Sequence, residues 1–319
     1  MARRGRADEV RGSAAGGRDA ADLPDRPGRA AGGREERVKE KTFVVAEVAA
    51  THGGSLDAAL RLVGLAREVG ADAVKFQWLS DPDRLVERRS APEYREQYRR
   101  LAFPRDWFPA LRERAGAEGV EFMCTAYLPE DVHVVAQHVS RFKVSSFEAL
   151  DRHFVALHAE YRKPLIVSAG MGAVARGLFN VLQRYRQAYP ADTLPDVSVL
   201  HCVSAYPCPE GEIRLARLRP NFTVMEPLQY AGLSDHTRHP WTGALAVAAG
   251  ARIVEFHLRP LETNEMDADY WVARDPSEAL EYVRNIRTAE WMLGQEEAEA
   301  RWSASPAEEP MLRYRTGVA

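Results

Sequence analysis

From residue 42 to about residue 293, short apolar and β-branched runs alternate with stretches whose apolar residues recur at helical spacing. The expected strands are residues 43–47, 73–77, 121–125, 141–145, 165–169, 197–202, 231–235 and 252–257. The expected helices are residues 56–69, 106–118, 130–137, 152–161, 174–188, 212–218, 241–249 and 277–293. Eight strand–helix units in one continuous stretch predict an α/β fold of the (β/α)8 TIM barrel type.

Two features of this pattern leave an alternative open. The seventh strand is the least distinct, because residues 225–230 could form it in place of residues 231–235. A doubly wound open sheet is the alternative architecture. No Gly-x-Gly-x-x-Gly follows an early strand, so the usual dinucleotide-binding site is not expected.

The first 41 residues have a different composition from the rest of the chain. They contain eleven basic and eight acidic residues, seven glycines and almost no large apolar side chain. Such a segment cannot bury enough apolar surface to become ordered, so we expect a disordered tail at 1–41. The catalytic barrel is expected at 42–294 and a C-terminal extension at 295–319.

Charge and hydropathy argue against two classes of partner. The chain has 43 basic and 46 acidic residues, and beyond residue 41 the count is 32 against 38. A nucleic-acid-binding surface would need a basic excess, so no nucleic acid partner is expected. No run approaches the roughly 20 apolar residues that span a bilayer, and the first ten residues lack the apolar core of a secretory signal. We therefore expect a cytoplasmic protein without a membrane partner.

Lysine is scarce, and its positions point to a site. Beyond residue 41 the chain keeps only Lys75, Lys143 and Lys163, and the first two lie inside apolar strand runs. An unpaired buried ammonium costs several kcal/mol, so these two lysines need anionic partners. At the carboxyl ends of barrel strands, two compact cations would suit a phosphorylated or carboxylated substrate. The alternative is a structural pairing with Glu47 or Glu148.

Histidines end the last two expected strands. His236 and His257 would meet over the mouth of a barrel, because neighbouring strands end side by side. Two imidazoles with a carboxylate, either Glu255 or a loop aspartate, suit a divalent transition metal with open positions. His52 and His201 follow or end other strands and are further candidates for contact with a ligand.

Six segments, in order along the chain, resemble the N-acetylneuraminate (sialic acid) synthase family. They are residues 46–55, 70–77, 142–146, 168–171, 201–207 and 232–237, and the resemblance spans roughly residues 43–294. It implies a metal-dependent condensation of phosphoenolpyruvate with a sugar aldehyde. The products would be a 2-keto-3-deoxy sugar acid and phosphate.

The resemblance also implies roles for individual residues. Phosphoenolpyruvate would be held by Lys75, Thr125, Lys143, Ser146, Ser168 and Ser234. The acceptor sugar would be oriented by Gln77, Ser204, Tyr206, Glu255 and Asp269. Mn²⁺ or Mg²⁺ would be bound by His236 and His257, and Glu47 would act on the attacking water or the developing charge. The expected catalytic residues are Glu47, Lys75, Lys143 and His236.

Departures from the family pattern lie mainly on the acceptor side. Thr51 and Ser204 stand where the family has Asn, and Phe256 stands where it has Lys. Asp269 is the expected counterpart of the family's acidic residue, with Asp267 as a rival. We therefore expect an acceptor other than N-acetylmannosamine, such as a sugar of a nucleoside or antibiotic pathway.

Three further expectations stay open. The family's C-terminal antifreeze-like domain is not expected after residue 294, so a homodimer would need another interface. A Schiff-base aldolase that uses Lys75 or Lys143 as the nucleophile is a rival enzyme. A barrel that binds a sugar or sugar phosphate without catalysis is a rival of another class.

Overall fold

The computed structural model describes residues 41–171, 174–187, 196–219, 229–267, 269–294 and 305–314. The chain divides into two units, residues 1–38 and 39–319. The first unit, and with it the predicted disordered tail apart from Lys41, lies outside the described residues. In the described ranges, no helix is both long and apolar enough to cross a membrane.

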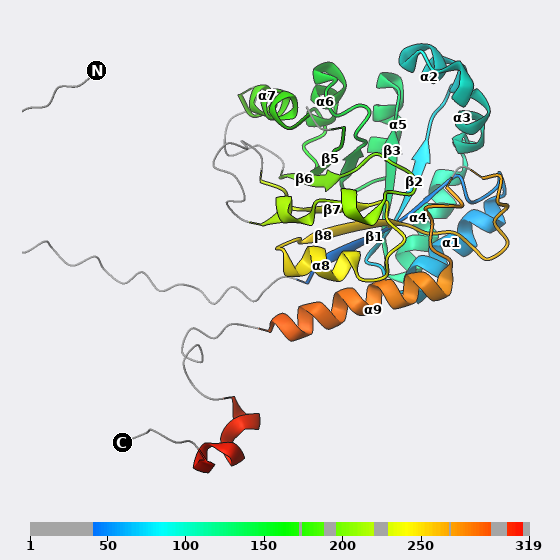
Figure 1. The fold of residues 1–319 in the computed structure, drawn as a ribbon. Coiled ribbons are helices and arrows are strands. Elements are labelled where there is room, and N and C mark those ends of the chain that lie inside the picture. The colour runs from blue at the N-terminus through cyan, green and yellow to red at the C-terminus, as the bar shows by residue number, and fades with distance from the viewer. Residues whose placement is uncertain are drawn as a thin grey trace, which may run out of the picture. The chain divides into compact units, whose positions relative to one another are not determined.

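Within the described residues, eight parallel strands close into a barrel in which each strand pairs with the next and the last pairs with the first (Figure 1). They are β1 Phe43–Ala49, β2 Ala73–Trp78, β3 Glu121–Ala126, β4 Phe142–Val144, β5 Leu165–Ala169, β6 Val197–Cys202, β7 Gly232–Asp235 and β8 Ile253–His257. The predicted (β/α)8 barrel is confirmed, and the open sheet is wrong. The seventh strand forms at the predicted place.

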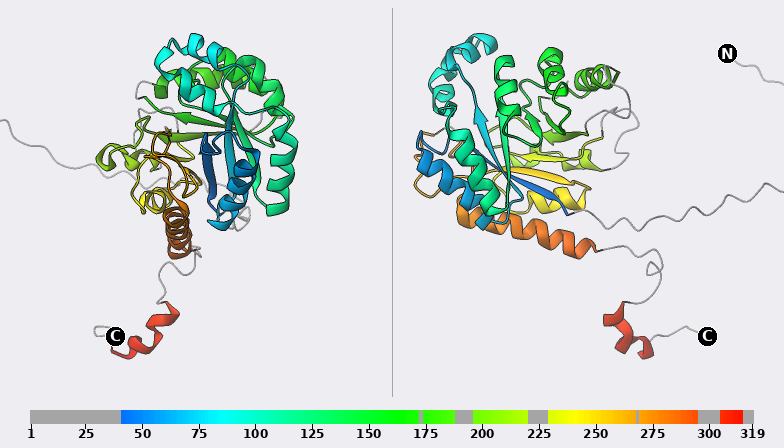
Figure 2. Two further views of the ribbon diagram at one scale, coloured as in Figure 1. Left: turned by 90° about the vertical axis from the view of Figure 1, so that its right-hand side faces the viewer. Right: turned by 180° about the vertical axis from the view of Figure 1, so that it is seen from behind.

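Helices surround the strands, as the two views of Figure 2 show. They are α1 Leu56–Glu68, α2 Pro82–Arg89, α3 Arg95–Leu101, α4 Trp107–Glu118, α5 Val132–Ala136, α6 Arg152–Ala159, α7 Val174–Gln187, α8 Thr242–Ala248 and α9 Pro276–Leu293. Short 3₁₀ turns add η1 Pro92–Tyr94, η2 Pro129–Asp131, η3 Glu210–Glu212, η4 Leu215–Leu218 and η6 Pro306–Tyr314. Most expected helices begin and end within two residues of the observed bounds.

The helix expected at residues 212–218 is wrong. The structure has the two 3₁₀ turns η3 and η4 there, with Arg214 between them in the left-handed conformation at a φ of 52°. A left-handed residue interrupts the run of α-helical hydrogen bonds, so neither turn extends into the other.

Helices α2 and α3, between β2 and α4, were not expected. Asp81 caps α2 by accepting hydrogen bonds from the backbone N–H groups of Asp83 and Arg84. Apolar side chains of the two helices, among them Leu85 and Leu101, pack with residues that end or follow β1, β2 and β3. The two helices therefore stand over the carboxyl ends of the first three strands.

The barrel interior is layered. The part of the interior nearer the amino ends of the strands is filled by a small apolar cluster. It consists of Val45, Ala73, Met123, Ile166, Leu200 and Ile253. Because alternate residues of a strand face the same side, the residues two positions later also face inward. These are Glu47, Lys75, Thr125, Ser168, Cys202 and Glu255. An apolar floor thus supports a polar layer near the carboxyl ends of the strands, where barrel enzymes build their sites.

Candidate active site

Four buried charges form the centre of the polar layer. The residues Glu47, Lys75, Lys143 and Glu255 are each at most 4% exposed. Lys75 forms an ion pair with Glu47, and its Nζ lies 3.7 Å from Oε2 of Glu255. Nζ of Lys143 lies 3.5 Å from Oε1 of Glu255. One carboxylate therefore lies between two ammonium groups, and the predicted clustering of the two lysines is observed.

Hydroxyl groups form hydrogen bonds with three of these four charged side chains. Lys75 donates to Oγ1 of Thr125 at 3.3 Å, and Lys143 donates to Oγ of Ser168 at 2.7 Å. Ser234 donates to Oε1 of Glu255 at 2.9 Å. Three of the four hydroxyls singled out in the sequence thus touch the charged centre. The fourth, on Ser146, lies 3.0 Å from the hydroxyl of Ser204.

Burial and mutual charge set the protonation of this centre. Burial alone would raise the pKa of Glu255, but the charges of Lys143 and Lys75 and the hydrogen bond from Ser234 lower it to about 2. Burial lowers the pKa of Lys75 to about 8, with the charge of Glu255 opposing that shift and the charge of Lys143 adding to it. The formal charges of the two lysines and two glutamates cancel, and Lys75 titrates just above pH 7.

A histidine pair lies beside this centre. The imidazole rings of His236 and His257 have centroids 5.4 Å apart. Nδ1 of His236 lies 2.7 Å from the carbonyl oxygen of Val203, and Nδ1 of His257 lies 3.4 Å from Oδ1 of Asp269. Burial, with the charge of His257, lowers the pKa of His236 to about 4, so that its ring is neutral at pH 7. The predicted meeting of the two strand-end histidines is observed.

These residues fit a divalent metal ion. A histidine that binds a metal commonly donates its other ring N–H to a carbonyl or a carboxylate. Nδ1 of His236 has such a hydrogen-bond partner, and the carboxylate of Asp269 lies near Nδ1 of His257 without a hydrogen bond. In the part of the chain that the structure describes, no three His, Cys, Asp or Glu side chains converge into a complete metal centre. A metal bound through Nε2 of the two histidines would keep open positions for oxygen atoms of substrate and water.

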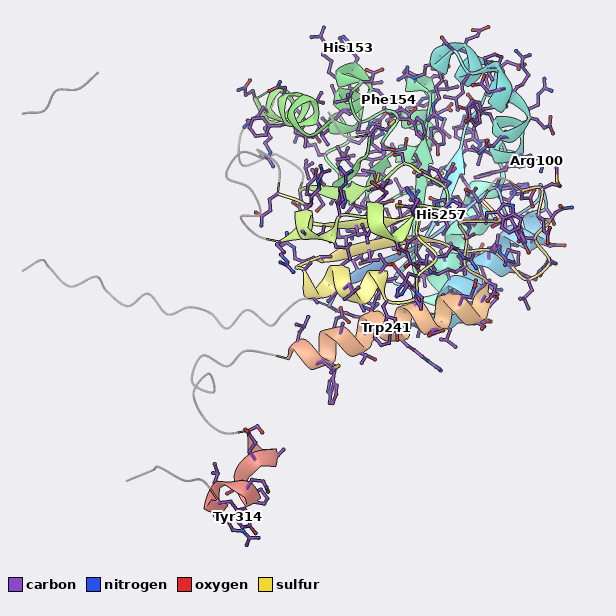
Figure 3. The ribbon with its side chains drawn as sticks, viewed as in Figure 1. Arg100, His153, Phe154, Trp241, His257 and Tyr314 are labelled. Carbon is purple, nitrogen blue, oxygen red and sulfur yellow. The ribbon has the colours of Figure 1, made fainter. Side chains whose placement is uncertain are left out.

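The two rival aspartates occupy different places. The carboxylate of Asp269 faces His257, whereas Oδ1 of Asp267 lies 2.8 Å from a guanidinium nitrogen of Arg100 on α3. Figure 3 labels His257 near the strands and Arg100 on the α3 side of the barrel. Of the two aspartates, Asp269 is the one next to the histidine pair.

The rim of the site holds the remaining expected acceptor residues. The ring of Tyr206 lies 4.2 Å from that of His236, centroid to centroid, and its side chain is partly exposed. Oε1 of Gln77 accepts a 2.5 Å hydrogen bond from the hydroxyl of Tyr127. Burial raises the pKa of Tyr127 well above its ordinary value, so this phenol stays a donor.

Tyr127 and Arg89 were missed in the sequence. Arg89, on the unexpected helix α2, donates to Glu148 and lies 5.0 Å from the ring centroid of Tyr127. Glu148 is therefore the ion-pair partner of Arg89, and the suggested pairing of a site lysine with this glutamate is wrong. Tyr127 could have been found in the sequence from its position two residues after Thr125. Arg89 lies in a charged segment, and no sequence pattern there indicates a role in the site.

Two histidines proposed as ligand contacts pack elsewhere. His52 accepts a hydrogen bond from the backbone N–H of Gly54, and its ring lies 5.7 Å from those of Phe103 and Trp107. Nε2 of His201 lies 2.7 Å from the carbonyl oxygen of Ile213, and the ring alternates in β6 with inward-facing neighbours. Both rings fill space outside the strands, so the expectation that they line the site is wrong.

Known proteins resemble this chain over most of its length. The model of the NeuB family matches residues 62–298. Pseudaminic acid synthase of Campylobacter jejuni is 31% identical over 271 residues, covering 80% of this chain and 76% of that protein. N,N'-diacetyllegionaminic acid synthase of Legionella pneumophila is 32% identical over 273 residues, covering 79% and 73%.

A solved structure has the same fold. The N-acetylneuraminic acid (sialic acid) synthetase of Leptospira borgpetersenii, in complex with citrate, superposes with a TM-score of 0.74 at 23% identity. The superposition covers 88% of this chain and 93% of that one. The structural match shows a common fold, and the sequence matches show the family. They confirm the resemblance to the sialic acid synthase family. The chain belongs to the NeuB family.

Proposed function

We propose that the protein condenses phosphoenolpyruvate with the aldehyde group of a sugar to give a 2-keto-3-deoxy sugar acid and phosphate. The observation that carries the proposal is the pair of buried ammonium groups, Lys75 and Lys143, on either side of Glu255 next to two histidines. The names of the two relatives, synthases of pseudaminic acid and of N,N'-diacetyllegionaminic acid, support a sugar acid as the product.

Phosphoenolpyruvate binds by replacing contacts that the lysines now make with protein carboxylates. It carries about three negative charges at neutral pH. Lys75 and Lys143 attract its carboxylate and phosphate, and the hydroxyls of Thr125, Ser146, Ser168 and Ser234 donate to its oxygen atoms. Because Glu47 and Glu255 already balance the lysines, the donor needs further positive charge. His236 and His257 would hold a divalent cation, Mn²⁺ or Mg²⁺, which would supply that charge and Lewis-acid activation of the acceptor's aldehyde group.

The reaction forms one carbon–carbon bond and breaks one carbon–oxygen bond. The enol carbon of phosphoenolpyruvate attacks the aldehyde carbon, and the aldehyde oxygen takes up a proton. Water adds to the phosphate-bearing carbon, where positive charge develops, and Glu47 accepts its proton. Oε1 of Glu47 is fixed by the 2.6 Å hydrogen bond from the backbone N–H of Ala49. Phosphate then leaves with its bridging oxygen, and the ketone forms.

The acceptor is altered from N-acetylmannosamine, and one substitution supports this most directly. Ser204 lies beside Ser146 at the site. Thr51 instead donates to the carbonyl oxygen of Val48, and Phe256 packs against Tyr282 outside the barrel. Of these three departures, only Ser204 contacts a residue assigned to phosphoenolpyruvate, Ser146. With Gln77, Tyr206, Glu255 and Asp269 it selects the acceptor, for which a sugar of a nucleoside or antibiotic pathway is a candidate.

The test is incubation with phosphoenolpyruvate, Mn²⁺ and a panel of aldoses that includes N-acetylmannosamine and other amino sugars. Phosphate and a 2-keto acid are expected in equal amounts with at least one acceptor. Lys143→Met removes a site cation and abolishes both products, whereas the exposed Lys41→Met leaves them unchanged. Absence of phosphate with every acceptor, together with no affinity for phosphoenolpyruvate, would overturn the proposal.

A Schiff-base aldolase is the second candidate, favoured by the lowered pKa of Lys75. Borohydride would then trap a substrate covalently on this lysine. Under the condensation mechanism no adduct forms, and removal of the metal stops turnover.

A further inference from the structure

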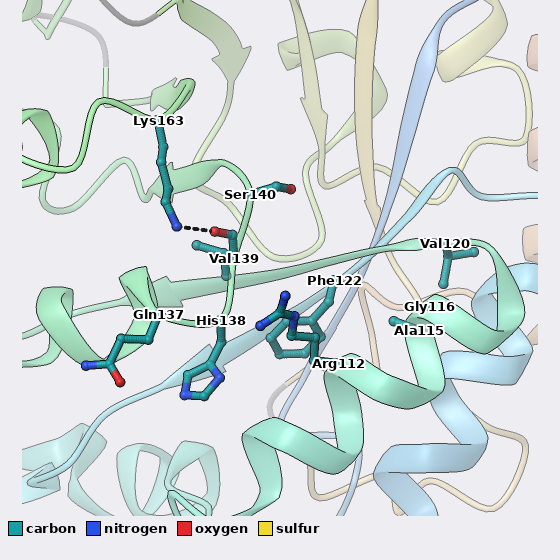
Figure 4. Close-up of a pocket in the computed structure, with 10 residues that line it drawn as sticks. All are labelled: Arg112, Ala115, Gly116, Val120, Phe122, Gln137, His138, Val139, Ser140 and Lys163. Atoms are coloured by element: carbon teal, nitrogen blue, oxygen red, sulfur yellow. Dashed lines mark hydrogen bonds between the residues drawn. The ribbon is translucent and has the colours of Figure 1, made fainter.

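A cavity of about 420 Å³, whose lining Figure 4 shows, lies near the amino ends of β3, β4 and β5, away from the candidate active site. It is lined by Arg112, Ala115, Gly116, Val120, Phe122, Gln137, His138, Val139, Ser140 and Lys163. Val120, Ser140 and Lys163 precede β3, β4 and β5, whereas the active-site residues lie at the carboxyl ends of the strands. The short helix α5 ends at Ala136, and the four residues that follow it line the cavity.

The polar lining of this cavity is basic. Arg112, His138 and Lys163 line it, and none of its lining residues is acidic. The guanidinium of Arg112 makes no hydrogen bond and no ion pair with any residue that the structure describes. Lys163 donates to the carbonyl oxygens of Ala136 and Val139, which leaves the third N–H of its ammonium group for another acceptor.

The acidic group that adjoins the cavity is already neutralised. Oε1 of Glu121 accepts hydrogen bonds from Ser140 at 2.6 Å and from Arg141 at 2.7 Å. The pKa of Lys163 is lowered by burial and then by the charge of Arg112. These cations therefore repel one another without a protein anion between them.

The other walls of the cavity are apolar. They are formed by Ala115, Val120, Phe122 and Val139. The ring of His138 is stacked on Phe108 at 4.6 Å, which fixes its plane. Gly116 lies inside α4, and a Cβ atom added there would meet no heavy atom within 4 Å. Packing does not require this glycine, and its missing side chain keeps the cavity open.

We propose that this cavity binds a small organic phosphate monoester, at a site separate from the one that carries the proposed condensation. The phosphate dianion lies between the guanidinium of Arg112 and the ammonium of Lys163, and the carbon part of the ester lies on the apolar walls. The volume falls within the roughly 300–1,000 Å³ of small-molecule sites.

The probe is phenyl phosphate, titrated calorimetrically into the full-length protein and into the full-length Lys143→Met variant, whose candidate active site has lost a cation. Phenyl phosphate is expected to bind, and inorganic phosphate about tenfold more weakly because it lacks the apolar part. Equal affinity for the two, or no binding of phenyl phosphate, overturns the proposal.

Two variants locate the binding. Arg112→Ala removes an exposed cation and is expected to weaken phenyl phosphate binding about tenfold or more. Gly116→Leu fills the cavity from a helix position and is expected to abolish binding. Arg67→Ala, an exposed arginine on α1 outside the cavity, is the matched control and keeps the affinity. Unchanged binding in both cavity variants, or loss of phenyl phosphate binding in Lys143→Met, contradicts the assignment. Circular dichroism verifies that each variant is folded.

Discussion

The ammonium of Lys143 lies 3.5 Å from a carboxylate oxygen of Glu255. The other oxygen of that carboxylate lies 3.7 Å from the ammonium of Lys75. All three groups are buried, so each charge has lost favourable solvation by water. The attraction between the carboxylate and the two ammonium groups offsets that loss. This arrangement holds two cations in fixed positions at the strand ends, where an anionic donor can take the place of the carboxylate.

Glu255→Gln tests whether the lysines depend on this carboxylate. The variant keeps a polar side chain for Ser234 but leaves two buried ammonium groups with Glu47 as their remaining ion-pair partner. We expect the free energy of unfolding to fall by roughly 3–5 kcal/mol in urea titrations. Glu262→Gln, at an exposed position, serves as the control and should change it by no more than about 0.5 kcal/mol. An equally small change for both variants would show that the buried cluster is not held by Glu255.

The pKa of Lys75 predicts a pH profile. Because burial lowers this pKa to about 8, the ammonium is lost as the pH rises through that value, and affinity for an anionic donor falls with it. We expect kcat/KM for phosphoenolpyruvate to decrease above about pH 8. Lys75→Arg keeps its charge over this range, so in a variant that retains activity the decrease should move to higher pH. A profile that is flat to pH 10 in the unaltered protein would contradict the role of Lys75.

The strands and the site lysines could be predicted from sequence for a simple reason. A strand in a closed barrel is apolar along its length, so Lys75 and Lys143 stood out against Val74 and Val144. The two strand-end histidines were found in the same way. Local patterns of this kind depend on a few neighbouring residues, and the observed strands agree with them.

Helices α2 and α3 could not be predicted because their apolar residues are few and set among charges, as in the segment 82–89. The contacts of Arg89 with Glu148 and Tyr127 join segments far apart in the chain, and no local pattern reports them. The orientation of His52 and His201 away from the site could not be predicted either, because no local pattern reports it. It depends on which side of the barrel wall a residue faces.

Asp269→Asn and Asp267→Asn distinguish the two aspartates. Asp269 faces Nδ1 of His257, and the loss of such a partner commonly weakens metal affinity by about 10–100-fold. Asp267 is paired with Arg100 instead, so its variant should leave metal affinity unchanged. Titration of Mn²⁺, followed by electron paramagnetic resonance, measures both. A larger effect at Asp267 would reverse the assignment.

His236→Gln should remove one of the two proposed metal ligands. We expect Mn²⁺ binding to fall by at least about tenfold and phosphate release to be lost, whereas the exposed His133→Gln should retain both. A chelator should stop phosphate release in the unaltered protein, and added Mn²⁺ should restore it. Turnover that persists after complete removal of metal would exclude this role for the histidine pair.

Oxygen-18 water tests the proposed condensation most directly. In the reaction as proposed, water adds to carbon and phosphate leaves with its bridging oxygen, so the new oxygen never reaches phosphorus. The protein is incubated in labelled water with phosphoenolpyruvate, Mn²⁺ and an accepted aldose, and the released phosphate is analysed by mass spectrometry. We expect unlabelled phosphate in an amount equal to that of the 2-keto-3-deoxy acid. Labelled phosphate, or phosphate without the sugar acid, would contradict the account.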